Sequence, residues 1–196
     1  MIEKAISIAE RVCKVGVWAS GILVLFMAVY ICIDVLLRKL FSVSISGGEE
    51  FSGYTLAIMS GWAFSYALFK KAHVRIDILY LKLPLKYRSV LDLLSLVALA
   101  IFVIPTTYYA FGVLHTSVLR NSVANTPLQT PLWIPQSLWF VSLVFFSIVL
   151  ILFLVGTISH LLRRDIISAY KLAGSTTLEE EIKEEAKIEG LSGEEG

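Results

Sequence analysis

Charged residues are scarce in this chain and almost absent from its long apolar stretches. They make up 17% of the 196 residues, whereas soluble domains average about 25%. Hydrophobic residues reach 57%, and the mean hydropathy is +0.76. This composition excludes an ordinary soluble domain and predicts an integral membrane protein.

Residues that could form catalytic or metal sites are also few. Cys13 and Cys32 lack the spacing of a disulfide framework or a zinc site. His73, His115 and His160 lie toward the ends of apolar stretches, so paired haem ligation between spans is not expected. The sequence contains no phosphate loop and no nucleophile elbow. We therefore expect no cofactor, no metal and no enzymatic activity.

Four apolar stretches are long enough to cross a bilayer, which takes about 20 residues of helix. The predicted spans cover about residues 16–37, 50–69, 89–114 and 135–162. The predicted fold is an all-α membrane protein with four transmembrane helices in a membrane domain of residues 15–164. Residues 1–14 have an apolar and a charged face, which predicts an amphipathic interfacial helix before the chain turns into the first span at Gly16.

Lysine and arginine are distributed unequally between the two sides of these spans. Twelve lie before the first span, in the second connection or just after the fourth span, and only three lie in the other two connections. Because positive residues stay in the cytoplasm, both termini are expected there. The acidic tail of residues 165–196 is expected to be cytoplasmic and disordered. The basic clusters flank spans and lack stacking aromatics, so the expected partner is the lipid bilayer and not nucleic acid.

The stretch KKAHVRIDIL (residues 70–79) has the densest mixture of ionisable groups. His73 and Asp77 could form a catalytic pair, whereas the apolar positions around them fit an amphipathic helix in the membrane interface that ends at Pro84. Because the stretch directly follows a span on the basic side, we favour an interface motif of His73, Arg75 and Asp77.

The first span carries one carboxylate, Asp34, four residues before Arg38. This spacing places both side chains on one helix face and predicts an intrahelical ion pair. Two roles are open for Asp34: an ion or proton ligand, or a structural contact at the end of the helix. The position near the end of the span favours the structural role.

The second span begins with SISGGEEFSG and contains small residues every fourth position. Ser46 and Glu49 have the spacing of a capping box. A row of small side chains permits close approach of another helix. The pattern leaves open whether that helix belongs to this chain or to a partner subunit. If it belongs to a partner, the predicted contact consists of Arg38, Glu49, Glu50, Gly53, Ala57, Gly61 and Ser65.

The connection before the fourth span, NTPLQTPLWIP, has three prolines four residues apart. Proline stiffens the chain, so we expect an extended path that leads into the first turn of the fourth helix. The predicted docking loop consists of Pro127, Pro131, Trp133 and Pro135.

No predicted span has an ionisable residue near its middle. Ion-coupled carriers need a desolvated binding site, which intramembrane charges usually mark. The residues therefore leave two classes, a membrane helper subunit or an unusual small carrier.

Five segments in order resemble a known family: DVLLRKLF (34–41), GGEEFSGY (47–54), HVRIDIL (73–79), LPLKYRSVLDLL (83–94) and TPLWIPQSLWF (130–140). Over about residues 10–164 the chain is similar to the small DctQ-type membrane subunit of tripartite ATP-independent periplasmic (TRAP) transporters. Gly48 departs from the tryptophan that often precedes the glutamate pair, and the acidic tail lies outside the pattern.

The resemblance implies a non-catalytic scaffold subunit in a bacterial inner membrane. Its implied partners are a large multi-span TRAP subunit, which carries substrate and sodium, and a periplasmic substrate-binding protein. The implied solute bears a carboxylate, such as a sialic acid or a dicarboxylate. Two alternatives remain open: a self-sufficient small homo-oligomeric carrier that uses Asp34 or Asp92, and an anchor subunit of another membrane complex.

Overall fold

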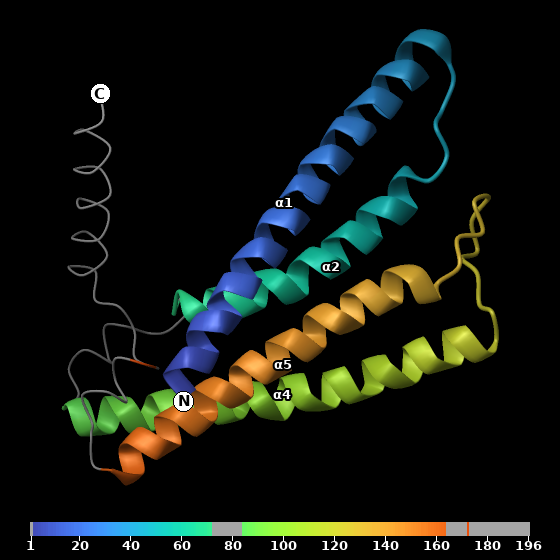
Figure 1. The fold of residues 1–196 in the computed structure, drawn as a ribbon. Coiled ribbons are helices and arrows are strands. Elements are labelled where there is room, and N and C mark those ends of the chain that lie inside the picture. Colours follow the sequence, from blue (N-terminus) through green and yellow to red (C-terminus); the bar gives the residue numbers. More distant parts are fainter. Residues whose placement is uncertain (1, 72–83, 164–171, 173–196) are drawn as a thin grey trace, which may run out of the picture.

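The structure is a computed structural model that describes residues 2–71, 84–163 and 172. The described chain is built from four long helices, labelled as in Figure 1: α1 (Ile2–Phe41), α2 (Gly48–Phe69), α4 (Leu85–Leu119) and α5 (Trp133–Leu162). The predicted all-α class is confirmed for these residues.

The helices run alternately up and down. The start of α1, the end of α2, the start of α4 and the end of α5 lie at one end, called here the N-terminal end (Figure 1). The linker of residues 42–47 and the connection of residues 120–132 lie at the opposite end, called the loop end (Figure 1). Toward the loop end α1 diverges from α4 and α5 (Figure 1).

Helix α5 is the centre of the bundle, since it contacts each of the other three helices. Its buried apolar side chains include Val149, Leu150 and Phe153, which join Leu68 of α2 and Leu96 of α4 in one apolar core. These core residues come from the halves of the helices that lie toward the N-terminal end. Burial of large apolar side chains therefore holds the four helices together mainly at that end.

Helix α1 continues without a break through residue 16, so the turn predicted at Gly16 is wrong. Gly16 instead lies against the ring of Trp62, where an added Cβ would be 2.6 Å from the Cζ3 atom. The Trp62 ring also packs against Phe145 of α5, with ring centroids 4.9 Å apart. Gly16 is therefore a packing position that lets an indole approach the backbone of α1. Whether residues 1–14 lie on a membrane surface stays a prediction.

Three described helices are long and apolar enough to cross a membrane: Lys4–Phe41, Tyr87–Leu119 and Trp133–Leu162. Helix α2 is not among them, although its 22 residues would extend about 33 Å. Four spans and cytoplasmic termini thus remain predictions. The expected interface motif of His73, Arg75 and Asp77 and most of the acidic tail lie outside the described residues.

Candidate functional site

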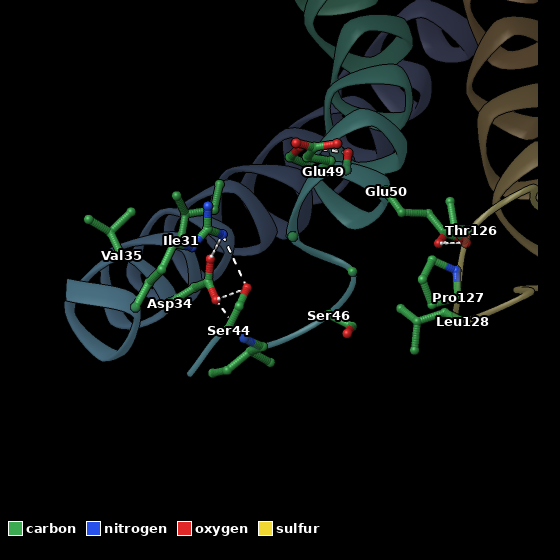
Figure 2. A pocket seen from close by; sticks show the side chains of 15 residues that line it. Ile31, Asp34, Val35, Ser44, Ser46, Glu49, Glu50, Thr126, Pro127 and Leu128 are labelled. Atoms are coloured by element: carbon green, nitrogen blue, oxygen red, sulfur yellow. Dashed lines mark hydrogen bonds and ion pairs between the residues drawn. The ribbon is translucent and has the colours of Figure 1, made fainter. Parts of the chain in front are cut away.

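An open pocket of about 450 Å³ lies at the loop end, between the α1–α2 linker and the connection before α5 (Figure 2). Its polar lining residues are Asp34, Arg38, Ser44, Ser46, Glu49, Glu50, Ser52 and Thr126, and Pro127 and Leu128 close one side. We call it the loop-end pocket.

Asp34 fixes the linker onto the end of α1. Its carboxylate accepts hydrogen bonds from Arg38 Nη2 at 2.5 Å, the Ile45 backbone N–H at 2.6 Å and Ser44 Oγ at 3.1 Å. The predicted ion pair with Arg38 is therefore present, and it is one part of a larger network (Figure 2). Asp34 is only 6% exposed, and most of its hydrogen-bonding capacity is used by its own chain. This arrangement fits the structural role better than that of an ion ligand.

The capping box predicted from Ser46 and Glu49 is wrong. The N-cap of α2 is Gly47, with φ 103°, and it makes no side-chain cap bond. The Tyr30 hydroxyl instead donates a hydrogen bond to the Ser46 backbone carbonyl at 3.0 Å. A glycine is favoured at position 47 because φ is positive, a conformation that strains other residues, and the end of the Leu128 side chain lies where a Cβ would project. A local sequence pattern could not reveal this, since Leu128 comes from a distant segment.

Residues 122–132 fold back on themselves and do not follow the predicted extended path. The Ala124 N–H donates to the Thr130 carbonyl at 2.9 Å, and the Leu132 N–H donates to the Ser122 carbonyl at 3.0 Å. The turn between these pairs closes where the Gln129 N–H donates to the Thr126 carbonyl at 3.1 Å. Pro127 occupies the second position of that turn, where a fixed φ favours a bend. We call residues 122–132 the loop hairpin.

Glu50 joins the loop hairpin to the first turn of α2. Thr126 Oγ1 donates to Glu50 Oε2 at 2.5 Å (Figure 2). The Tyr54 hydroxyl donates to Glu50 Oε1 at 2.9 Å. The Thr130 side chain also interacts with this carboxylate. The first turn is a favourable place for Glu50, because the N-terminal end of a helix carries partial positive charge.

The charge of the loop-end pocket is negative. It contains three carboxylates, those of Asp34, Glu49 and Glu50, and one guanidinium, that of Arg38. Asp34 and Arg38 neutralise each other, and the Glu50 carboxylate faces hydroxyl donors. Glu49 is exposed, so it presents its charge at the mouth of the pocket.

This pocket and its hairpin lie within a segment that matches a known family. Residues 27–160 match the family model of tripartite ATP-independent periplasmic transporters, DctQ component. The match covers more than half of the chain. The chain belongs to the DctQ family. Comparison with curated proteins and with solved structures gave no match.

The matched segment of this DctQ chain contains every residue that lines the loop-end pocket. A transporter component with helices that can span a membrane is a membrane protein, as the composition predicted. The match also makes the chain one part of an assembly with several components.

The small-residue row of the DctQ chain is divided between two environments. Gly61 and Ser65 are buried, and an added Cβ on Gly61 would be 2.7 Å from Ser142 Cβ of α5. Gly53, one end of the row, is exposed and has no atom within 4 Å of an added Cβ. Gly61 and Ser65 therefore pack inside the chain. Contact with a partner subunit stays a prediction for the other two residues of the row, the exposed Gly53 and the half-buried Ala57.

The predicted docking loop is partly accessible. Pro127, Pro131 and Trp133 are exposed, whereas Pro135 is buried in the first turn of α5. The sequence reasoning missed Thr126, which binds Glu50. A signal was present in the repeated Thr-Pro pairs at 126–127 and 130–131, which place hydroxyl groups on both sides of a bend.

Proposed function

We propose that this DctQ chain is the non-catalytic scaffold subunit of a sodium-coupled TRAP uptake transporter. Its partners are a large multi-span membrane subunit and a periplasmic substrate-binding protein. The large subunit moves sodium and a carboxylate-bearing solute, such as a sialic acid or a dicarboxylate. The small subunit anchors the large one and helps the binding protein to dock.

The observation that carries this proposal is the environment of Asp34. It is the one carboxylate of the first apolar stretch, and its oxygens accept hydrogen bonds from Arg38, Ser44 and the Ile45 backbone. A cation or proton site must keep carboxylate oxygens available to the ion. Since this carboxylate is occupied by its own chain, the transport chemistry is assigned to the partner.

The polar groups in the middle of the described helices support the same assignment. Ser65 donates to the Gly61 carbonyl at 2.9 Å, and Ser142 donates to the Trp139 carbonyl at 2.7 Å. Thr107 of α4 and Ser147 of α5 form a hydrogen bond of 2.9 Å between helices. These bonds join helices or satisfy hydroxyls, as is usual in membrane bundles.

The proposed topology has four spans in the bacterial inner membrane, with both termini in the cytoplasm. Helix α2 becomes the fourth span because its 22 residues match a bilayer core of about 30 Å. It lies between α1 and α5, so part of its less apolar surface is covered by protein. This orientation directs the loop-end pocket and the loop hairpin to the periplasm, where a binding protein docks.

Most of α1 is available for the large subunit. Trp18, Ile22 and Leu25 are 65–75% exposed in the described chain. We assign this face of α1, together with the exposed small residues of α2, to the contact with the large subunit. Van der Waals packing of such surfaces drives helix association in membranes.

Reconstitution into liposomes tests the proposal. The purified chain alone is expected to show no sodium-driven uptake, and uptake is expected when the large subunit and the binding protein are added. Liposomes with the large subunit and the binding protein but without this chain are the matched control. Sodium-driven uptake by the isolated chain would refute the scaffold role and favour a self-sufficient carrier.

A further inference from the structure

The polar contacts between the loop hairpin and α2 converge on one carboxylate. The Glu50 carboxylate accepts hydrogen bonds from the Thr126 hydroxyl of the hairpin and from the Tyr54 hydroxyl of its own helix. The second hairpin threonine, Thr130, interacts with the same group. These two threonines flank the hairpin turn, and the hydrogen bond from Thr126 ties the turn directly to α2.

The apolar contact beside this carboxylate depends on the same placement of the hairpin. The Leu128 side chain lies against Gly47, at the point where a Cβ would otherwise project. Pro127 and Leu128 form one wall of the loop-end pocket (Figure 2). Movement of the hairpin away from α2 would therefore open this wall and change the outer surface of the pocket.

Among the described residues, the loop hairpin is joined to α2 by the side-chain hydrogen bond from Thr126 to Glu50. Some of its backbone bonds run within the hairpin, and others join it to the neighbouring helices: the Ser122 N–H donates to the Ser117 carbonyl of α4 at 3.0 Å, and the Pro131 carbonyl accepts from the Ile134 N–H of α5 at 3.2 Å. They preserve its shape but do not fix its angle to α2. Pro127, Gln129 and Pro131 are exposed. A small hairpin that is joined to the ends of α4 and α5 can change its angle to α2 when its hydrogen bond to Glu50 is released.

We infer that Glu50 is a latch that holds the loop hairpin closed against α2, and that the closed hairpin is the form recognised by the periplasmic binding protein. The second half of this inference rests on the proposed docking function. The first half concerns this chain alone. Glu50 is a positioning residue, because it acts through the hairpin.

The expected size of the effect follows from a single hydrogen bond. The net contribution of one such bond corresponds to roughly a threefold to tenfold change in the closed-to-open ratio. A partner that binds only the closed form loses affinity in proportion to the closed fraction. Thr126→Val removes the hydroxyl and keeps the side-chain shape, whereas Thr126→Ser keeps the hydroxyl.

Distance measurement by double electron–electron resonance tests the latch in the full chain in lipid nanodiscs. Spin labels are placed on the exposed positions Val43 and Gln129, in a background with Cys13→Ala and Cys32→Ser. The parent is expected to give one main distance. Thr126→Val is expected to add a longer distance with a threefold to tenfold larger share of open molecules.

Glu50→Gln provides a second variant, because an amide keeps the shape of the carboxylate but loses its charge. It is expected to add the same longer distance, and Thr126→Ser is expected to match the parent. The matched control is Thr116→Val, which removes a hydroxyl bonded only to the Gly112 carbonyl of its own helix. Unchanged distances in both Thr126→Val and Glu50→Gln would overturn the latch.

Binding of the periplasmic protein to the two-subunit membrane complex tests the second half. Thr126→Val is expected to raise the Kd by the factor by which the closed fraction falls, with unchanged recovery of the large subunit. An altered distance with an unchanged Kd would overturn recognition of the closed hairpin and leave the latch supported. A parent complex that binds no periplasmic protein would contradict the proposed docking function instead, and the distance measurements would still decide the latch.

Discussion

Gly61 of α2 lies against Ser142 of α5, and adding one methyl group there tests the closest approach of these two helices. An added Cβ would be 2.7 Å from Ser142 Cβ and 3.1 Å from its backbone carbonyl carbon. Both values are well below the usual carbon–carbon contact distance of about 3.5–4.0 Å. Gly61→Ala must therefore push the helices apart or rotate them.

The magnitude follows from two opposing contributions. Overpacking of a well-packed interior by a methyl group costs about 1–3 kcal/mol. Replacing glycine with alanine inside a helix returns up to about 1 kcal/mol. Gly61→Ala is therefore expected to lower the free energy of unfolding by up to about 2 kcal/mol.

Gly53→Ala is the matched control on the same helix. An added Cβ at Gly53 meets no atom within 4 Å, so only the favourable helix contribution applies. We expect the SDS concentration at the unfolding midpoint, measured in mixed micelles by circular dichroism, to fall for Gly61→Ala and to rise for Gly53→Ala. Equal stability of the two variants would refute the packing of Gly61 against α5.

A second substitution distinguishes the proposed contact from a general weakening of α2. Ser142→Gly removes the Cβ and hydroxyl that face Gly61. The double variant Gly61→Ala/Ser142→Gly is expected to be more stable than the sum of the single effects predicts, by about 0.5–3 kcal/mol for residues in direct contact. If the effects of the two single substitutions simply add, the loss of stability in Gly61→Ala does not come from its contact with Ser142.

Two further substitutions test other contacts in the described chain. Gly16→Ala should destabilise the chain because its Cβ would enter the ring of Trp62, whereas Gly21→Ala, with no atom within 4 Å, should not; SDS unfolding of the pair measures the difference. Asp34→Asn should leave uptake by the complete transporter intact. It should also speed protease cleavage in the linker of residues 42–47, since a neutral amide cannot form the ion pair with Arg38. Loss of uptake with an intact linker would instead favour a direct role of Asp34 in transport.

The sequence was sufficient for the helices because each one depends on a local property. The apolar runs at residues 16–37 and 135–162 predicted helices that the structure places at Ile2–Phe41 and Trp133–Leu162. The observed helices are longer because a helix continues through polar residues as long as its backbone bonds form. The predicted spans were placed from apolar residues alone. The helices were therefore predicted correctly, but several of the residues at which they begin and end were not.

The candidate site was less predictable because it depends on segments that are far apart in the chain. Asp34 and Arg38 are four residues apart, and their ion pair could be predicted from helix geometry. Glu50 and Thr126 are 76 residues apart, and their hydrogen bond requires the whole bundle to be in place. Gly16 was misread for the same reason, since its partner Trp62 lies on another helix.

The two ends of the bundle are held by different interactions, and this difference favours the loop end as the part that adapts to partners. Toward the N-terminal end, Leu68, Leu96 and Phe153 belong to a continuous apolar core. Toward the loop end, an apolar pocket of about 360 Å³ separates α1 and α2 from the start of α5. The polar contacts there centre on two carboxylates, Asp34 for the linker and Glu50 for the loop hairpin.

Single hydrogen-bonded contacts can be released one at a time, whereas a close-packed core resists small displacements. In the proposed scaffold role, the subunit needs a fixed part that anchors the large subunit and an outer part that engages a partner only transiently. The core supplies the fixed part through α5, which contacts all three other helices. The loop hairpin and the linker supply the other part, and their polar contacts are where substitutions should change docking without loosening the membrane complex.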